Sequence, residues 1–396
     1  MPALNTAELQ ASRMLFSWGG VREPASPMKP HAVLLAWYYC RYGEETWQIN
    51  RREFLACAFA SPFLIGRRAA AQAPIFTGDM HFHSFFAESK YHARPLAQTL
   101  AAGNASLVAW SLVGDLLWFD VKTYKQKSVP KPGEALGWFQ RELGRIKEHV
   151  AQQKLKIQRG PADVDLALRG QPHIVLAVEG ASFIEADARH VKTAYDLGVR
   201  HLQLVHYTRN AIGDIQTEPA DHQGLTKLGK QVVGECNRLG ILIDLAHSTE
   251  AAVVDALSIS RTPMVWSHGS VTRAAPASAS AQVWRRRQLS LDTAKEIAHK
   301  GGVVGLWGLT IDVGKTVEAY ADRMIELADW LGNDHVAFGT DINGLGPFSV
   351  LSGYGDIRRV IDHWRRQGVD EARIRKLAIG NYARVLKAAL EPAGRR

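Results

Sequence analysis

Two histidines one residue apart, His81 and His83, follow an apolar run that starts at Ile75. In an extended chain, residues i and i+2 point to the same side, so both imidazoles can reach one ion. Imidazole suits zinc and its first-row neighbours as a ligand. Because many His-x-His pairs lie on protein surfaces without a ligand, this pair gains meaning only from similar residues elsewhere.

Five more residues that can ligate a metal or carry a proton stand where predicted strands end: Glu179, His206, His247, His268 and Asp341. Each alone could be an ordinary core or surface residue. The chain has only 15 histidines in 396 residues, so their recurrence at strand ends is not explained by composition. We interpret the set as a metal-hydrolase site.

The elements that must position these residues are eight apolar, β-rich runs at 74–80, 106–112, 174–178, 201–205, 241–246, 264–267, 303–307 and 336–340. Helix-period segments separate them, as at 134–156, 226–239, 291–299 and 317–331. Continuous apolar strands alternating with helices indicate an α/β fold with a covered parallel sheet. Eight units favour a (β/α)8 TIM-like barrel, with its active site at the carboxyl ends of the strands. An open dinucleotide fold is disfavoured, because no G-x-G-x-x-G follows the first strand.

The residue types fit a two-metal hydrolase. Two neighbouring divalent ions need a bridging anion, and Glu179 can give one carboxylate oxygen to each. Neutral imidazoles fill the other positions, and a bridging water, deprotonated to hydroxide, attacks a carbonyl carbon. Asp341 can take the proton and pass it to the leaving amine.

From Asp79 to about Arg384 the chain resembles the renal (membrane) dipeptidase family of zinc peptidases, which are relatives of the amidohydrolases. The motifs that carry the resemblance are Gly198-Val199-Arg200 leading to His206 and Asn210, the run 240–247, Pro263 to His268, the Gly-x-Asp at Asp341, and Gly380-Asn381 with Arg384-Val385. The resemblance implies hydrolysis of the peptide bond of dipeptides, with two divalent metal ions as cofactors and zinc as the expected metal.

Carried over by position, the family implies one metal on His81, His83 and Glu179, and a second on Glu179, His247 and His268. The family usually has Asp where this chain has His83, so one anionic ligand becomes neutral. The metal pair then gains a unit of positive charge, which should lower the pKa of its water further.

The same resemblance implies that His206 holds the scissile carbonyl and its oxyanion, and that Asp341 is the acid/base. Arg287 would bind the carboxylate of the substrate. The segment 269–284 is longer than usual before three consecutive arginines, so the sequence leaves open whether Arg285, Arg286 or Arg287 faces the site.

Residues 1–73 read as a leader that ends in a twin-arginine signal peptide. The pattern Asn50-Arg51-Arg52-Glu53-Phe54-Leu55 precedes an apolar run to Ile65 and an alanine-rich cleavage site that ends at Ala73. The run is too short to span a bilayer. We therefore expect export to the periplasm and a mature barrel domain at 74–396, with no stable membrane anchor.

Composition limits the other function classes. The chain is 46% hydrophobic with a net charge of +9, and no basic run with interleaved aromatics occurs beyond the three arginines, so nucleic acid is not an expected partner. The alternatives left open are a barrel hydrolase of another amide, a lactone or an ester, and a family member that binds a ligand without turnover. The sequence does not decide between a monomer and a homodimer.

Overall fold

The computed structural model describes residues 73–84, 95–274 and 282–391, and all of them belong to one compact unit, Ala73–Arg396. The predicted leader and its cleavage site lie almost wholly outside the described residues. Among the described residues, no helix has the length and apolar content needed to cross a membrane.

The predicted barrel is confirmed. Eight parallel strands follow one another in a single sheet: β1 (Thr77–Phe82), β2 (Ala105–Val113), β6 (His173–Glu179), β7 (Val199–Gln203), β8 (Leu242–Asp244), β9 (Val265–Trp266), β12 (Val303–Leu306) and β13 (Val336–Phe338). The sheet is nearly closed. The backbone N–H of His83 donates to the carbonyl of Ile342 at 3.0 Å, and that of Asp341 donates to the carbonyl of His81 at 3.0 Å. The last strand is thereby joined to the first just beyond β13.

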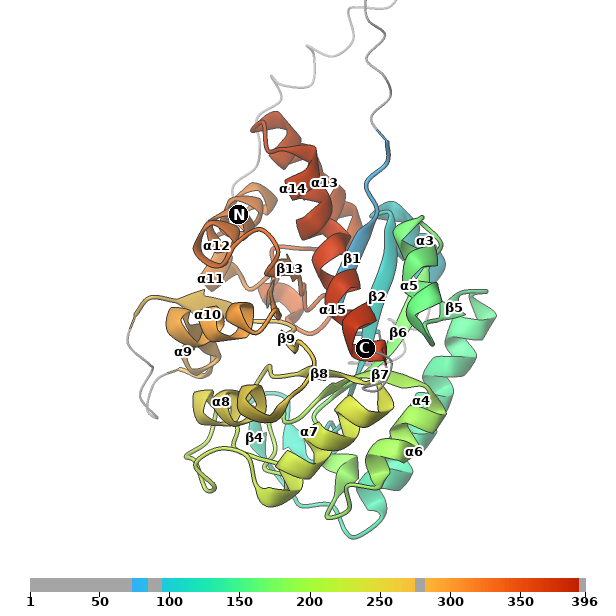
Figure 1. The fold of residues 1–396 in the computed structure, drawn as a ribbon, viewed down its shortest axis with the longest axis vertical. Helices are drawn as coiled ribbons and strands as arrows, with labels where there is room; N and C mark the ends of the chain where they lie inside the picture. The colour runs from blue at the N-terminus through green and yellow to red at the C-terminus, as the bar shows by residue number, and fades with distance from the viewer. Residues whose placement is uncertain (1–72, 85–94, 275–281, 392–396) are drawn as a thin grey trace, which may run out of the picture. The chain divides into compact units, whose positions relative to one another are not determined.

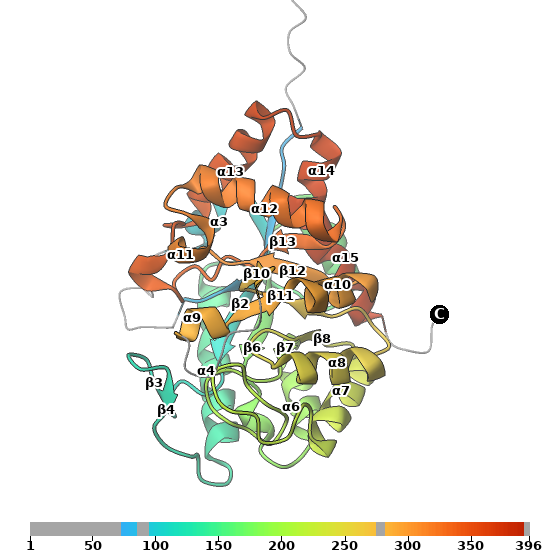
Figure 2. The same cartoon turned by 90° about the vertical axis from the view of Figure 1, so that its left-hand side faces the viewer.

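Helices surround the strands, as Figures 1 and 2 show: α3 (Leu96–Ala102), α4 (Glu134–Gln152), α5 (Pro161–Leu168), α6 (His190–Leu197), α7 (Lys227–Leu239), α8 (Glu250–Ile259), α10 (Leu291–His299), α12 (Val317–Leu331), α13 (Tyr354–Arg366), α14 (Glu371–Arg375) and α15 (Asn381–Leu390). Several begin where the sequence supplies a cap. The Thr226 hydroxyl accepts the N–H of Gly229 at the start of α7, and Ser290 and Thr316 cap α10 and α12 in the same way. Such caps satisfy backbone donors that the first turn leaves free.

Shorter elements complete the chain: β3 (Phe119–Asp120), β4 (Lys125–Gln126), β5 (Lys156–Ile157), β10 (Ser270–Thr272), β11 (Gln288–Ser290), α9 (Val283–Arg286), α11 (Thr310–Val313), the 3-10 turns η2 (Ser182–Ile184) and η3 (Gly346–Phe348), and the π-helical turn η4 (Lys376–Gly380). The long segment 115–161, between β2 and α5, contains the antiparallel pair β3–β4, helix α4 and β5.

Several predicted boundaries differ from the observed ones by one or two residues, and two differ by three or more. The first strand runs from Thr77 to Phe82 and not from 74 to 80, because its ladder with β2 begins at Thr77 and Pro74 has no N–H to donate. The helix predicted to reach Lys156 ends at Gln152. Lys154 adopts a left-handed φ of 56°, and the chain then pairs with β6 as β5.

Helix α15 covers the amino ends of the strands. Leu242, Val265 and Val303, the first residues of β8, β9 and β12, share a buried apolar cluster with Tyr382 and Leu386 of α15. The amino-terminal end of the barrel is therefore filled by packing, and the carboxyl end is left to carry the site.

Candidate metal centre

His81, in β1, and His83, directly after β1, lie at the carboxyl end of the barrel. His81 and His83 are 1% and 2% exposed, and their Nε2 atoms lie 3.0 Å apart. The Nδ1 of His83 lies 2.9 Å from the carbonyl oxygen of Ser111, so this nitrogen carries the proton that it donates. The Nε2 of a neutral His83 ring then holds a lone pair that faces the site.

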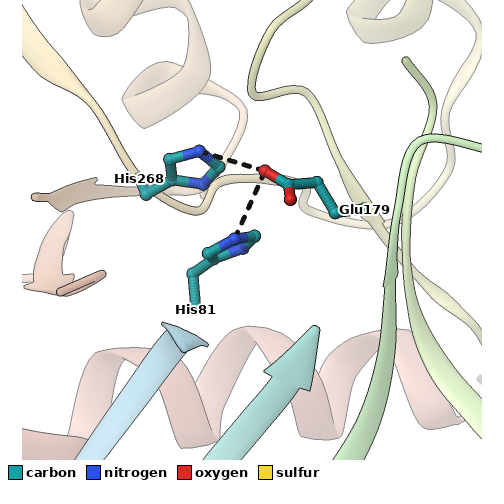
Figure 3. Close-up of side chains that lie close together, drawn as sticks. All are labelled: His81, Glu179 and His268. Carbon is teal, nitrogen blue, oxygen red and sulfur yellow. Dashed lines mark ion pairs between the residues drawn. The ribbon is translucent and has the colours of Figure 1, made fainter. Parts of the chain in front are cut away.

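Glu179, the last residue of β6, lies at the centre of a ring of imidazoles. Its Oε1 is 3.3–3.4 Å from the Nε2 atoms of His81, His206, His247 and His268, and its Oε2 is 3.5 Å from Nε2 of His83. Figure 3 shows His81 and His268 directed at the same carboxylate oxygen.

The electrostatics of the site keep Glu179 ionised. Burial alone would raise the pKa of its carboxyl, but the neighbouring imidazoles, His206 and His81 foremost, hold that pKa well below its usual range. The two carboxylate oxygens of Glu179 face different imidazole nitrogens, as a ligand that bridges two metal ions requires.

His247 and His268 follow β8 and β9, and their Nε2 atoms lie 3.1 Å apart. Burial, with Arg287 and other imidazoles nearby, holds the pKa of each ring well below its usual range. Both rings are therefore neutral, which is the state that ligates a metal. The Nδ1 of His268 lies 2.9 Å from the hydroxyl of Ser267, which fixes the ring orientation.

Asp341 follows β13 and places its Oδ1 3.4 Å from Nε2 of His83. Both Asp341 and His247 have left-handed φ angles, 54° and 68°, which non-glycine residues adopt at an energetic cost. Gly344 makes room for the carboxylate, because a Cβ on this glycine would lie 1.9 Å from Oδ1 of Asp341.

His206 has a partner that the sequence analysis missed. Asp115, two residues beyond β2, places its Oδ1 2.6 Å from Nδ1 of His206. Its Oδ2 accepts the N–H groups of Tyr207 at 3.1 Å and Thr208 at 2.8 Å. Burial lowers the pKa of His206, but Asp115 and Glu179 outweigh it and raise that pKa. The position of Asp115 after the second strand was a signal of the same kind as the other strand ends.

Of the three consecutive arginines, Arg287 is the one whose side chain lines a cavity at the carboxyl end of the barrel. It is fully buried, donates from Nη1 to Oε1 of Gln216 at 2.8 Å, and has Nη2 3.0 Å from Nε2 of His268. Arg286 donates to the carbonyl of Thr217, and Arg285 lies against the ring of Trp284. Among the described residues, no carboxylate forms an ion pair with Arg287. A buried guanidinium in this state is suited to an anionic ligand.

The donor set fits divalent metal ions. Three groups of donors lie close enough to hold an ion: His81 with Glu179 and His268, His81 with His83 and Asp341, and Glu179 with His206 and His247. Glu179 Oε2 is buried and has no hydrogen-bond partner among the described residues. These groups share members, and they differ from the two ligand sets that the family resemblance implies. The assignment of each residue to one ion therefore remains a prediction.

A cavity of about 420 Å³ opens beside these residues. Its polar side holds His83, Glu179, His206, Arg287 and Asp341, so the structure brings the predicted site residues together around one space. Tyr124, from the turn between β3 and β4, and Tyr207 also line it, and neither was singled out from the sequence.

Comparisons with known proteins identify similar sequences and a similar fold. The model of the family described as membrane dipeptidase (peptidase family M19) matches residues 94–395. The dipeptidase tcpJ of Claviceps purpurea is 28% identical over 54% of this chain and 50% of its own length, and the dipeptidase verJ of Clonostachys rogersoniana is 27% identical over 55% of each. The match thus spans about half the length of these curated relatives.

A solved metallo peptidase from Rhodobacter sphaeroides, liganded with a phosphinate mimic of the dipeptide L-Ala-D-Ala, has the same fold. It superposes with a TM-score of 0.65 at 22% identity, covering 80% of this chain and 99% of the other.

Proposed function

The chain belongs to the membrane dipeptidase family, and from that premise we propose that it is a binuclear metal-dependent hydrolase that cleaves the peptide bond of dipeptides. The observation that carries the proposal is the buried Glu179 carboxylate, faced by five imidazoles at the carboxyl end of the barrel. Two metal ions that share a ligand need neutral imidazoles gathered around one ionised carboxylate, and this site has that arrangement.

The metal ligands in this proposal are His81, His83 and Glu179 for one ion, and Glu179, His247 and His268 for the other. Zinc is the proposed metal, because neutral imidazoles and a carboxylate form its usual ligand set. When bound, the two ions supply an activated water and polarise the scissile carbonyl.

The other residues of the site bind the substrate and move protons. Asp115 raises the pKa of His206, and the protonated ring can donate from Nε2 to a carbonyl oxygen as that oxygen gains negative charge. Asp341, held over Gly344, accepts a proton and returns it to the leaving amine. Arg287 binds the free carboxylate through a planar fork that meets both oxygens.

A dipeptide is the substrate that suits both the buried guanidinium of Arg287 and the size of the cavity. Its carboxylate lies one residue from the scissile bond, and Arg287 Nη2 is 3.0 Å from Nε2 of His268 at the metal centre. The dipeptide mimic bound by the Rhodobacter sphaeroides relative supports a ligand of this size. A barrel hydrolase of another amide, a lactone or an ester is the alternative, and it gives no role to the buried Arg287.

We also propose that the protein is exported to the periplasm by the twin-arginine route. Support comes from the sequence alone: the paired Arg51 and Arg52, the apolar run that follows, and the alanine-rich end of the leader. The twin-arginine route carries folded proteins, which suits a chain that acquires metal ions as it folds.

The proposed function is tested by assaying purified, zinc-loaded protein against free dipeptides, their amides, tripeptides, lactones and esters. We expect free dipeptides to be hydrolysed with the highest kcat/KM, and Glu179→Gln to remove the activity together with at least one ion. Equal or faster turnover of lactones or esters would refute the dipeptidase assignment. Loss of ions without loss of activity would refute the metal mechanism.

A further inference from the structure

The cavity has two chemically different ends. Arg287 lies beside His268, with Nη2 3.0 Å from Nε2, whereas Asp341 lies beside His83, with Oδ1 3.4 Å from Nε2. Glu179 contacts both histidines and so lies between the two ends. If the carboxylate of a dipeptide is bound by Arg287, its C-terminal residue occupies the Arg287 end. Its N-terminal residue then occupies the Asp341 end.

Four apolar side chains that line the cavity come from the loop after Asp341 and from the segment that pairs with it; they are Leu309, Ile311, Leu345 and Phe348, and we call them the apolar wall. Leu345 and Phe348 follow Asp341 by four and seven residues, in the loop after β13 and in η3. Leu309 and Ile311 come from the loop after β12 and from α11.

The two loops that carry the apolar wall are joined by backbone contacts. Leu309 forms an antiparallel bridge with Ser349, and the N–H of Val350 donates to the carbonyl of Gly308 at 2.8 Å. The wall is therefore one surface that is fixed relative to Asp341. Two of its members remain largely exposed, Ile311 at 56% and Phe348 at 61%, although the described part of the chain has few large apolar side chains that are this exposed.

We propose that the apolar wall binds the side chain of the substrate's N-terminal residue and selects dipeptides in which that residue is large and apolar. This inference rests on the proposed dipeptidase function. A bulky aliphatic or aromatic side chain would cover Ile311 and Phe348 and remove their apolar surface from water, which is favourable. A polar side chain of the same size would lose much of its hydration there, because the four wall side chains offer no hydrogen bond and Thr310, between Leu309 and Ile311, offers a single hydroxyl.

The selectivity is measured with four dipeptides on zinc-loaded protein: Leu-Ala, Asn-Ala, Ala-Leu and Ala-Ala. Leu and Asn have similar size, so their ratio isolates polarity at the N-terminal position. Since pocket contacts of this kind are worth roughly 10–200-fold, we expect kcat/KM for Leu-Ala to exceed that for Asn-Ala by at least about tenfold. Equal values for Leu-Ala and Asn-Ala would overturn the inference while leaving the dipeptidase function standing. No hydrolysis of any of the four would overturn both.

Substitutions in the apolar wall test whether these side chains cause the selectivity. Phe348→Asp should lower the ratio of kcat/KM for Leu-Ala to that for Ala-Ala by about tenfold, and Ile311→Asp should act in the same direction. Both positions are largely exposed, so the variants are expected to fold. Val254→Asp is the matched control, because Val254 is a similarly exposed apolar residue, at 55%, on α8 outside the cavity. The control should leave the ratio unchanged.

The ratio of Ala-Leu to Ala-Ala tests the orientation of the substrate. Phe348→Asp should change this ratio by less than about twofold, because the C-terminal side chain lies at the Arg287 end. If Phe348→Asp instead lowered the Ala-Leu ratio and spared the Leu-Ala ratio, the assignment of the apolar wall to the N-terminal residue would be wrong.

Discussion

Replacing Arg287 tests whether the enzyme recognises a free carboxylate. The guanidinium is fully buried, and its Nη1 is held by Gln216. Its Nε has no hydrogen-bond partner among the described residues, and Nη2, which lies 3.0 Å from Nε2 of His268, carries a second N–H. Nε and Nη2 therefore form the edge that can meet two carboxylate oxygens together. Removing one member of such a buried charge pair typically costs about 2–5 kcal/mol.

At about 1.36 kcal/mol for each tenfold change, Arg287→Ala should lower kcat/KM for free dipeptides by roughly 30-fold or more. For dipeptide amides, which lack the charge, the loss should nearly vanish. The assay is therefore a two-by-two comparison, of wild type and Arg287→Ala against each dipeptide and its amide, and it yields the coupling directly.

Arg286→Ala provides the matched control, because the neighbouring Arg286 donates to the carbonyl of Thr217 and does not line the cavity. It should leave the dipeptide-to-amide ratio unchanged. If Arg287→Ala lowered the turnover of dipeptides and amides by the same factor, Arg287 would act on the fold or on the metal centre, and carboxylate recognition would be refuted.

Three further changes have expected outcomes. Gly344→Ala forces Asp341 to move, and kcat should fall by about 10²-fold, because misplacing a catalytic group by about 1 Å can cost about that factor. The control Gly355→Ala, whose added Cβ would meet no atom within 4 Å, should leave kcat unchanged. Asp115→Asn removes the charge that supports His206 and should lower kcat by about 10- to 100-fold with little change in KM; equal kcat values would show that the pair is not used in turnover. Replacing both arginines of the leader by lysine should hold the protein in the cytoplasm, and mass spectrometry of exported wild type should find an N-terminus directly after the alanine-rich end of the leader; an uncleaved, cytoplasmic active protein would contradict export.

The barrel could be predicted because its strands are buried on both faces and therefore appear as continuous apolar runs. The helix at Val317–Leu331 could be predicted in full, since Thr316 caps its start and Gly332 follows its end. The end of α4 could not. Lys154 has a left-handed backbone conformation and β5 is only two residues long, so neither gives a periodic sequence pattern that would mark the end of the helix.

The metal centre could be proposed because parallel strands bring their carboxyl ends to one edge, whatever the distance between them in the sequence. The same reasoning did not reach contacts that depend on side-chain packing. Asp115 meets His206 across 91 residues, and the choice among the three arginines depends on the turn that ends α9. The apolar wall depends on two loops that pair only in the folded chain.

The measurement that tests the account most directly is a titration of zinc into metal-free protein, with bound metal and the rate of dipeptide hydrolysis followed in the same samples. With Glu179 shared between two ions, we expect the rate to rise until two ions per chain are bound, and Glu179→Gln to bind fewer ions and stay inactive. Full activity at one ion per chain, or full activity in Glu179→Gln, would contradict the shared metal centre.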